Sequence, residues 1–473
     1  MGSKTIRALL FWVQQKRWLL LILFVGLTMY WLPYPESISA QGYRTFIICV
    51  MVVALIITEP VPLPAVALLI AILEVAFRIT DPTGAAKSFM GDSVFFIMGS
   101  LMMAVAIVHQ GLDTRLALGI IELTGNKVRN IVFGFTAISA ILSSFVGEHT
   151  VVAMMLPVGL SLIRNMPKGK KIPNLTALIL FSIAYGSTIG SIGTPSGGAR
   201  NAIMIEYWRT FTDTTLTYTQ WIVMAYPVVL IGIASASILL MFAFKPEYKI
   251  MDTAVRKLRV QVAKRGRIAG NEILSIIIFS ITFLCWVFLN EKIGMGIIAI
   301  GGAFLYMATG LIEWKQVSKE TNWGVILLFA GAISLGTHMK LTGTAVWLGE
   351  SVILATGGLM EQFELFRNFI VIIMTTVMSN IMSSSGTIAV LGPIVLNMGG
   401  DPLFMGMSAA IASAFGYFSA VAAPACMIIY SSGLVKVTDF LKAGWRLGLA
   451  SIVTLLIITQ FYWPYVKWLT NFQ

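Results

Sequence analysis

Residues 186–198 read GSTIGSIGTPSGG and interrupt an otherwise apolar stretch of the chain. Glycine permits unwinding and proline removes a backbone donor, so this run does not continue a regular helix. At membrane depth, backbone leaves the helix only where protein or a water-filled cavity surrounds it. The run therefore predicts a broken helix over residues 176–205, whose free carbonyl groups and helix ends bind a cation or an anion. A glycine-rich packing face between helices is the alternative interpretation.

The second half of the chain repeats the features of the first half. Gly99 and Gly331 each open an apolar segment of small residues. Pro157 and Pro393 each follow a polar cluster. A second interrupted apolar stretch, at residues 421–425, matches the first break. A duplicated membrane unit with broken helices is typical of secondary transporters that bind their solute between two repeats.

The composition is that of an integral membrane protein. The 473 residues are 57% hydrophobic and only 11% charged, which excludes a soluble globular domain. The net charge of +12 does not indicate nucleic acid as a partner, because 24 of the 33 Lys and Arg residues fall in segments that we trace to the cytoplasmic side. The three histidines and three cysteines have no metal-binding or disulfide spacing.

The apolar segments predict an all-α, polytopic membrane protein with about eleven transmembrane helices and two re-entrant hairpins. The two repeats are expected to be inverted relative to each other, with the N-terminus cytoplasmic. The expected segments are an N-terminal helix (1–43), a first repeat (44–244), a basic cytoplasmic linker (245–271) and a second repeat (272–473). The hairpins are expected at 130–163 and 367–398, and the broken helices at 176–205 and 404–434.

Three ionisable residues fall inside the first predicted hairpin and the first broken helix. Glu148 and His149 lie in the middle of the hairpin, and Arg200 follows the break. Such residues are costly in a bilayer and are functional candidates by default. The planar guanidinium of Arg200 suits an anionic substrate, and Glu148 or His149 would couple transport to Na⁺ or H⁺. A buried structural ion pair between Glu148 and Arg200 is the alternative.

Two polar clusters carry a resemblance to a known family: SSFVGEHTVVAMMLP at 143–157 and SNIMSSSGTIAVLGP at 379–393. Over nearly its whole length the chain resembles the divalent anion/sodium symporter family. That family has a Ser-Asn-Thr motif at each hairpin tip, a proline further on, and a Gly-Thr-Pro break like residues 193–195. Here Gly-Glu-His at 147–149 and Ser-Ser-Ser at 383–385 replace the two motifs, so the resemblance is that of a divergent member.

The resemblance implies a homodimeric, elevator-type transporter of dicarboxylates, citrate or sulfate. By position, and with Arg200 included, the predicted substrate-binding residues are Glu148, His149, Thr150, Thr194, Pro195, Arg200, Ser384, Ser385, Thr387 and Pro424. The same resemblance implies two Na⁺ sites that take oxygens from Gly147, Ser191, Gly193, Ser383, Gly386, Val421 and Ala423.

We expect a secondary active transporter of small anions (di- or tricarboxylates, or sulfate) driven by Na⁺ in a bacterial or archaeal inner membrane. A proton-coupled symporter or an anion exchanger that uses Glu148 and His149 is the alternative. A channel or a membrane-embedded enzyme is a more distant one. The sequence has no His-Glu-x-x-His, Gly-x-Ser-x-Gly or Cys-x-x-Cys motif, so no enzymatic activity is expected.

Overall fold

The computed structural model describes residues 14, 16–111, 124–167, 171–212, 216–256, 269–419 and 422–470. Within these ranges the regular elements are helices, and the only β-type pairing is an isolated bridge between Lys127 and Ile250. The prediction of an all-α protein is confirmed. Residues 1–13 of the predicted N-terminal segment and residues 257–268 of the predicted linker lie outside the described residues.

The two halves of the chain contain helices in a similar order. The first half contains α2 (Arg17–Trp31), α3 (Ala40–Thr58), α4 (Leu63–Ala76), α5 (Pro82–Ser88), α6 (Asp92–His109), α8 (Val128–Val146), α9 (Glu148–Arg164), α10 (Pro173–Gly190), η1 (Pro195–Gly197), α11 (Ala199–Thr212) and α12 (Tyr218–Ala243). The second half contains α14 (Gly270–Ile293), α15 (Met295–Ala308), α16 (Trp314–Glu320), α17 (Trp323–Leu341), α18 (Thr344–Ala355), α19 (Leu359–Gln362), α20 (Glu364–Ile381), α21 (Ser384–Leu396), α22 (Pro402–Ala412), α23 (Pro424–Ser431), α24 (Val437–Ile457), η2 (Ile458–Tyr462) and α25 (Trp463–Thr470).

Many of these helices have the length and composition of membrane spans. Eight of the described helical segments are long and apolar enough to cross a bilayer. Helices α2, α4 and α15 are also apolar but shorter. The number of crossings and the re-entrant path of the hairpins therefore stay predictions.

Each of the two segments predicted to form a hairpin consists mainly of a pair of consecutive helices. Helices α8 and α9 meet at Gly147, and α20 and α21 meet at Met382 and Ser383. Gly147 has φ 89° and ψ 147°, a conformation that residues with a Cβ rarely adopt. This glycine therefore lets the chain pass from α8 directly into α9. Ser383 caps α21, because its hydroxyl accepts from the Gly386 amide at 3.2 Å.

Both interrupted helices are broken in the structure, and the preceding helical pair holds each break. The chain is non-α-helical between Gly190 and Ala199, and the described residues between α22 and α23 are also non-α-helical. Ser144 Oγ at the end of α8 donates to the Gly190 carbonyl at 2.8 Å. In the second half, Asn380 at the end of α20 accepts from the Phe418 amide at 2.9 Å. The unwound backbone thus finds polar partners inside the protein, as membrane depth requires.

Part of the glycine-rich run packs against a helix instead of lining the break. A Cβ on Gly186 would be 2.5 Å from the Thr136 carbonyl of α8, and one on Gly190 would collide with the Ala140 carbonyl. Helices α8 and α10 approach closely because these positions have no side chain. The packing interpretation therefore holds for these two glycines, while the break itself begins after them.

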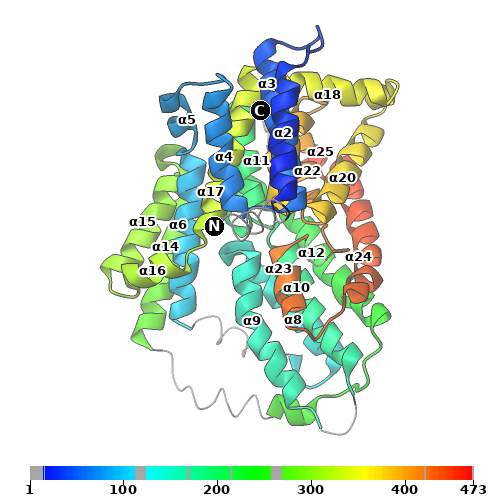
Figure 1. Cartoon of the computed structure of the whole chain (residues 1–473). Coiled ribbons are helices and arrows are strands. Elements are labelled where there is room, and N and C mark those ends of the chain that lie inside the picture. The colour runs from blue at the N-terminus through cyan, green and yellow to red at the C-terminus, as the bar shows by residue number, and fades with distance from the viewer. Residues whose placement is uncertain are drawn as a thin grey trace, which may run out of the picture.

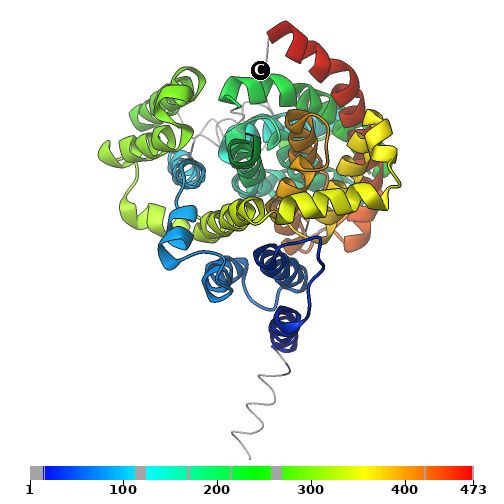
Figure 2. The same ribbon diagram turned by 90° about the horizontal axis from the view of Figure 1, so that it is seen from above.

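The broken helices lie in the middle of the molecule, with other helices around them. Figure 1 shows α5 and α18 at one end and the lower turns of α8 and α9 at the other. Seen from above, α2 to α4 form one edge, and α14 to α16 project at another (Figure 2). Helix α6 packs against α15, and α17 packs against α4.

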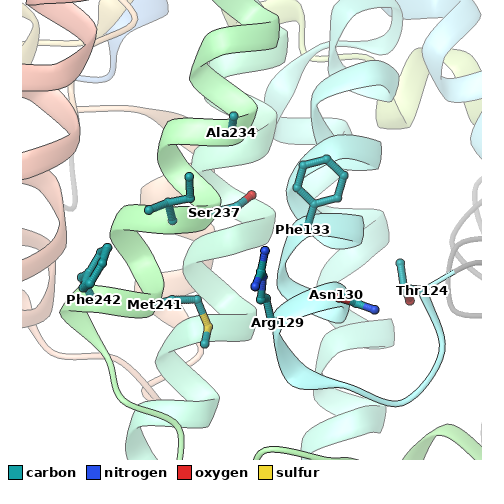
Figure 3. Close-up of a pocket in the computed structure, with 9 residues that line it drawn as sticks. Thr124, Arg129, Asn130, Phe133, Ala234, Ser237, Met241 and Phe242 are labelled. Carbon is teal, nitrogen blue, oxygen red and sulfur yellow. The ribbon is translucent and has the colours of Figure 1, made fainter.

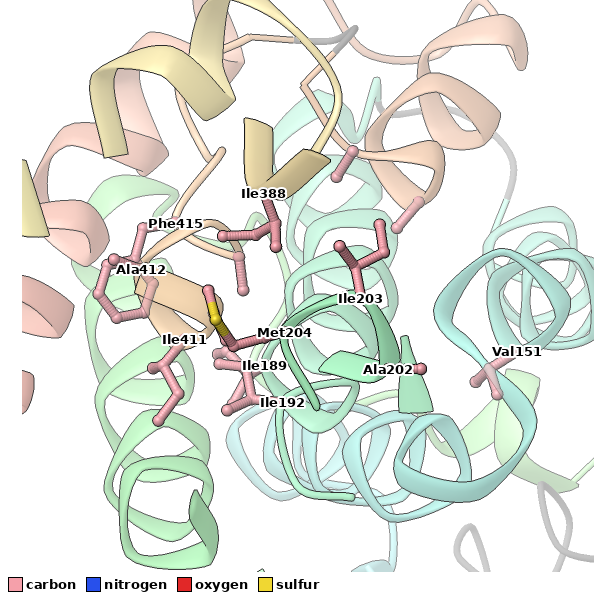
Figure 4. Close-up of a cluster of buried hydrophobic side chains, with 14 of the residues drawn as sticks. Val151, Ile189, Ile192, Ala202, Ile203, Met204, Ile388, Ile411, Ala412 and Phe415 are labelled. Carbon is pink, nitrogen blue, oxygen red and sulfur yellow. The ribbon is translucent and has the colours of Figure 1, made fainter. Parts of the chain in front are cut away.

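The centre of the core is where the two halves meet. Ile189 and Ile203, from the helices beside the first break, lie near Ile388 of α21 and Ile411 of α22 (Figure 4). These four side chains are at most 1% exposed. Aliphatic packing of this kind fixes the two breaks relative to each other, so that they support one shared site.

Candidate functional site

A cavity of about 70 Å³ lies where the first hairpin, both breaks and the second helical pair meet. Since one water needs roughly 10–15 Å³ of such space, the cavity admits a small ion or a few waters. Its wall consists of Ile97, Ser100 and Leu101 of α6, residues 146–149, residues 196–200, Val325 of α17, Ser385 of α21 and Pro424 of α23. Both halves of the chain therefore contribute to the wall.

Glu148 and Arg200 form a buried ion pair at this cavity. Arg200 Nη1 is 3.8 Å from Glu148 Oε1, and the two side chains are 2% and 8% exposed. Arg200 Nη2 donates to Ser191 Oγ at 2.5 Å, and Ser191 Oγ lies 3.3 Å from Glu148 Oε2. Arg200 Nε has no acceptor among the described residues. The guanidinium therefore keeps N–H groups for a further acceptor, such as an anion.

The sequence around the break holds the guanidinium in place. A Cβ on Gly198 would be only 3.3 Å from Arg200 Nη1, so glycine lets the guanidinium lie close to the backbone. Asn201 donates its side-chain amide to the carbonyl groups of Ser191 and Thr194, at 2.8 and 2.7 Å. These bonds fix the chain on both sides of the break, and the arginine is presented on a rigid support.

The structure brings six of the predicted site residues to the cavity wall. They are Gly147, Glu148, His149, Arg200, Ser385 and Pro424. Ser191, predicted as a cation ligand, lies behind the wall and accepts from Arg200. Val421, predicted as another cation ligand, lies outside the described residues.

Other predicted residues lie behind the wall and hold the backbone. Thr194 Oγ1 donates to the Ser144 carbonyl, and Thr387 Oγ1 donates to the Ser383 carbonyl at 3.1 Å. The Ser384 hydroxyl is buried and has no partner in the part of the chain that the structure describes. The cavity wall also does not include the predicted residues Thr150, Pro195, Gly193, Gly386 and Ala423.

The sequence analysis missed the part of the wall that comes from α6 and α17. Ser100 of α6 is the polar member of this group, and its hydroxyl has no partner within the described ranges. A signal was present, because Ser100 follows Gly99 and Val325 precedes Gly331 in the duplicated small-residue segments. That duplication indicated a repeat but not which residues face the solute.

Comparison with known proteins assigns the family. Residues 14–469 match the model of the family described as "Sodium:sulfate symporter transmembrane region". The chain belongs to the sodium:sulfate symporter family. The resemblance predicted from the hairpin and break motifs is thereby confirmed. Members of this family and the related proteins below are transporters, so the expectation that the chain is not an enzyme is also confirmed.

Two relatives align with this chain over most of the length of both proteins. It is 26% identical over 456 residues to the sodium-dependent dicarboxylate transporter SdcS of Staphylococcus saprophyticus, covering 91% of this chain and 88% of that protein. It is 26% identical over 473 residues to the sodium-dependent high-affinity dicarboxylate transporter 3 of Caenorhabditis elegans, covering 89% and 83%. The apolar helices and the family together identify an integral, multi-pass membrane protein.

Solved structures of other transporters share the fold. The Alcanivorax borkumensis YdaH transporter has a TM-score of 0.55 at 11% identity, with 80% of this chain and 87% of that chain covered. Neisseria gonorrhoeae MtrF has a TM-score of 0.55 at 11% identity, with 83% and 84% covered. At this identity the similarity concerns the fold alone.

A second buried ionisable pair lies away from the cavity. Glu74 Oε1 of α4 is 3.1 Å from His338 Nδ1 of α17. Ser334 Oγ donates to Glu74 Oε2 at 2.7 Å, and Ser88 Oγ lies 2.6 Å from Ser334 Oγ. The group joins α4, α5 and α17, and none of its members lines the cavity.

Proposed function

We propose that the protein is a secondary active transporter that couples the movement of a small dianion, a dicarboxylate or sulfate, to Na⁺. The observation that carries this proposal is the buried Arg200 guanidinium at a cavity formed by both repeats. Its Nε has no acceptor in the described chain, and a carboxylate or sulfate oxygen would supply one. The names of the family and of the relatives support the same class of solute.

Several residues at the cavity would each contribute a different interaction with the bound anion. Arg200 contributes the positive charge, and Ser100 and Ser385 contribute hydroxyl groups to the same cavity. The tight turn at Gly147 brings the α9 N-terminus to the anion, where its backbone amides and dipole favour negative charge. Pro424 begins α23 in the same wall, so a second helix N-terminus adds to the effect.

An elevator motion of the hairpins and broken helices against the remaining helices would expose this cavity to each side in turn. Helix α11 contacts α6 through polar groups: Arg209 Nη1 is 3.4 Å from Asp92 Oδ2, and Ser93 Oγ donates to Glu206 Oε2 at 2.5 Å. Polar contacts at such a boundary are easier to exchange with water than an apolar core. We place the protein as a homodimer in a bacterial or archaeal inner membrane, with its N-terminus cytoplasmic.

A proton-coupled symporter or an anion exchanger is the second candidate. Glu148 and His149 both line the cavity, and each can take up a proton. Under this mechanism Glu148 would lose its charge when the anion binds beside Arg200. The driving ion then differs, but the solute class and the site stay the same.

Uptake into proteoliposomes tests the proposal. Purified protein is reconstituted, and uptake of radiolabelled succinate is measured with an inward Na⁺ gradient, an inward H⁺ gradient, or neither. We expect saturable uptake that the Na⁺ gradient stimulates and that excess unlabelled sulfate or dicarboxylate inhibits. Stimulation by H⁺ alone would favour the second candidate. Uptake of neither succinate nor radiolabelled sulfate under any gradient would contradict the proposed solute class.

A further inference from the structure

The residues at the first break indicate how many coupling ions accompany the solute. The inference drawn from them rests on the proposed function. Unwound carbonyl groups of a broken membrane helix commonly coordinate Na⁺ in secondary transporters. The sequence predicted such a site near Gly147, Ser191 and Gly193.

Four carbonyl groups at the first break already have side-chain donors. Those of Ser191 and Thr194 both accept from the Asn201 amide. The Ile192 carbonyl accepts from Trp221 Nε1 at 2.9 Å, and the Gly190 carbonyl accepts from Ser144 Oγ. All of these donors are buried protein groups. The break therefore differs from an open ring of oxygens that waits for an ion.

A fixed positive charge lies beside the same backbone. Arg200 Nη2 donates to Ser191 Oγ, and Arg200 Nη1 lies over Gly198 and 3.8 Å from Glu148 Oε1. A second cation at Ser191 would be close to this guanidinium in a buried, low-dielectric place, where like charges repel strongly. The residues of the first break therefore do not fit a free Na⁺.

The second repeat contributes no such charge to the cavity. Its described wall residues are Val325, Ser385 and Pro424, which are uncharged. We propose that Arg200 is a resident cation that takes the place of one coupling ion at the first break, so that an exchangeable cation binds only on the side of the second repeat. Glu148 serves as the counter-ion that holds the guanidinium there.

The test counts the Na⁺ ions that bind to the purified full-length protein, using radiolabelled Na⁺ at equilibrium. We expect the wild type to bind at most one Na⁺ per chain at the two predicted cation sites taken together. Arg200→Ala leaves the Glu148 carboxylate and Ser191 without their cation, so this variant should bind one Na⁺ more than the wild type. Arg200→Lys keeps a positive charge and should bind the same number as the wild type.

A second variant provides a test if Arg200→Ala alone does not fold. Glu148→Asn combined with Arg200→Ala leaves no unpaired carboxylate, and we again expect one additional Na⁺. Arg446→Ala, an arginine of α24 outside the cavity, is the matched control and should leave the count unchanged. Equal counts in the wild type and in either folded Arg200→Ala variant, or two or more ions on the wild type, would overturn the inference. An ion bound by the variant but none by the wild type would support it and refute Na⁺ coupling.

A groove of about 860 Å³ lies on the outer surface of the helices, between α8 and α12 (Figure 3). Its wall is mostly apolar, with Phe133 on α8 and Ile238, Met241 and Phe242 on α12. Phe133 is 50% exposed and Phe242 is 72% exposed. In a membrane protein such a surface contacts acyl chains.

One end of this groove is positively charged. Arg129 lines it, and Lys127 lies two residues before Arg129, beside the segment in which the Lys249 carbonyl accepts from the Val128 amide at 3.0 Å. Asp252 of that segment accepts from the Asn126 side-chain amide. The nearby carboxylate of Glu247 is occupied, because it accepts from the first backbone amides of α10. We infer that the groove binds an anionic phospholipid, with an acyl chain along the apolar wall and the phosphate at Arg129.

Native mass spectrometry of the detergent-purified protein tests this second proposal, with phosphatidylglycerol and phosphatidylcholine added in parallel. We expect phosphatidylglycerol to remain bound, and Arg129→Gln to reduce its retention about fivefold, the effect of one basic residue near a headgroup. Ala234→Trp should displace the lipid by filling the groove while the charge remains. Arg446→Gln is the control. Equal retention of the two lipids, or unchanged retention in both groove variants, would overturn the proposal.

Discussion

At the residue scale, the Glu148–Arg200 pair makes a direct prediction about stability. Removing one partner of a buried pair leaves an uncompensated charge, which costs about 3–5 kcal/mol. We therefore expect Glu148→Gln and Arg200→Met each to lower the thermal unfolding temperature in detergent. The double variant should recover part of the loss, because neither charge remains. Additive losses in the double variant would show that the two side chains do not depend on each other.

A second prediction at this scale concerns Ser100. Ser100 lines the cavity and its hydroxyl has no partner among the described residues, so Ser100→Ala removes no described hydrogen bond within the protein. We expect an unchanged unfolding temperature but a KM for the anion raised about five- to tenfold, the effect of one hydrogen bond to a bound solute. Ser408→Ala is the matched control, since this buried hydroxyl also has no partner but lies outside the cavity wall. Equal KM values for the two variants would exclude Ser100 from substrate binding.

The residues that the sequence did and did not reveal differ in a physical respect. Glu148, His149 and Arg200 stood out because charge inside an apolar segment is costly and so has a local signal. Glu74 of α4 carries the same kind of signal, but its pairing with His338 does not, because the two residues are far apart in the chain and meet only through the packing of α4 on α17. Contacts of this kind depend on tertiary structure alone.

At the element scale, the close approach of α8 and α10 depends on glycine. A Cβ on Gly190 would collide with the Ala140 carbonyl, whereas nothing lies within 4 Å of a Cβ on Gly301 of α15. We expect Gly190→Ala to destabilise the protein by about 1–3 kcal/mol through overpacking and to reduce uptake. Gly301→Ala, another glycine within a helix, should be neutral or slightly stabilising. Similar unfolding temperatures for both variants would show that α8 and α10 can separate at little cost.

The same elements show how far local sequence predicts structure. Glycine, proline and small polar residues mark the ends of helices, and they indicated both helical pairs and both breaks. They did not separate the two uses of glycine in residues 186–198, where Gly186 and Gly190 pack against α8 and Gly198 lies beside Arg200. The neighbour that a glycine approaches comes from another helix, so its function follows only from the assembled fold.

At the scale of the whole molecule, the inverted arrangement that the sequence predicts for the two halves can be checked by labelling. Charge counting assigns the basic segment after α12 to the cytoplasm and the segment around α18 to the outside. The three native cysteines are at most partly exposed and are first replaced by serine or alanine. We then expect Lys249→Cys to react with a membrane-impermeant maleimide only in inverted vesicles, and Glu350→Cys only in intact cells. Labelling of both positions from one side would contradict the predicted inversion of the halves. The elevator motion proposed above could then not expose the shared cavity to the two sides of the bilayer in turn.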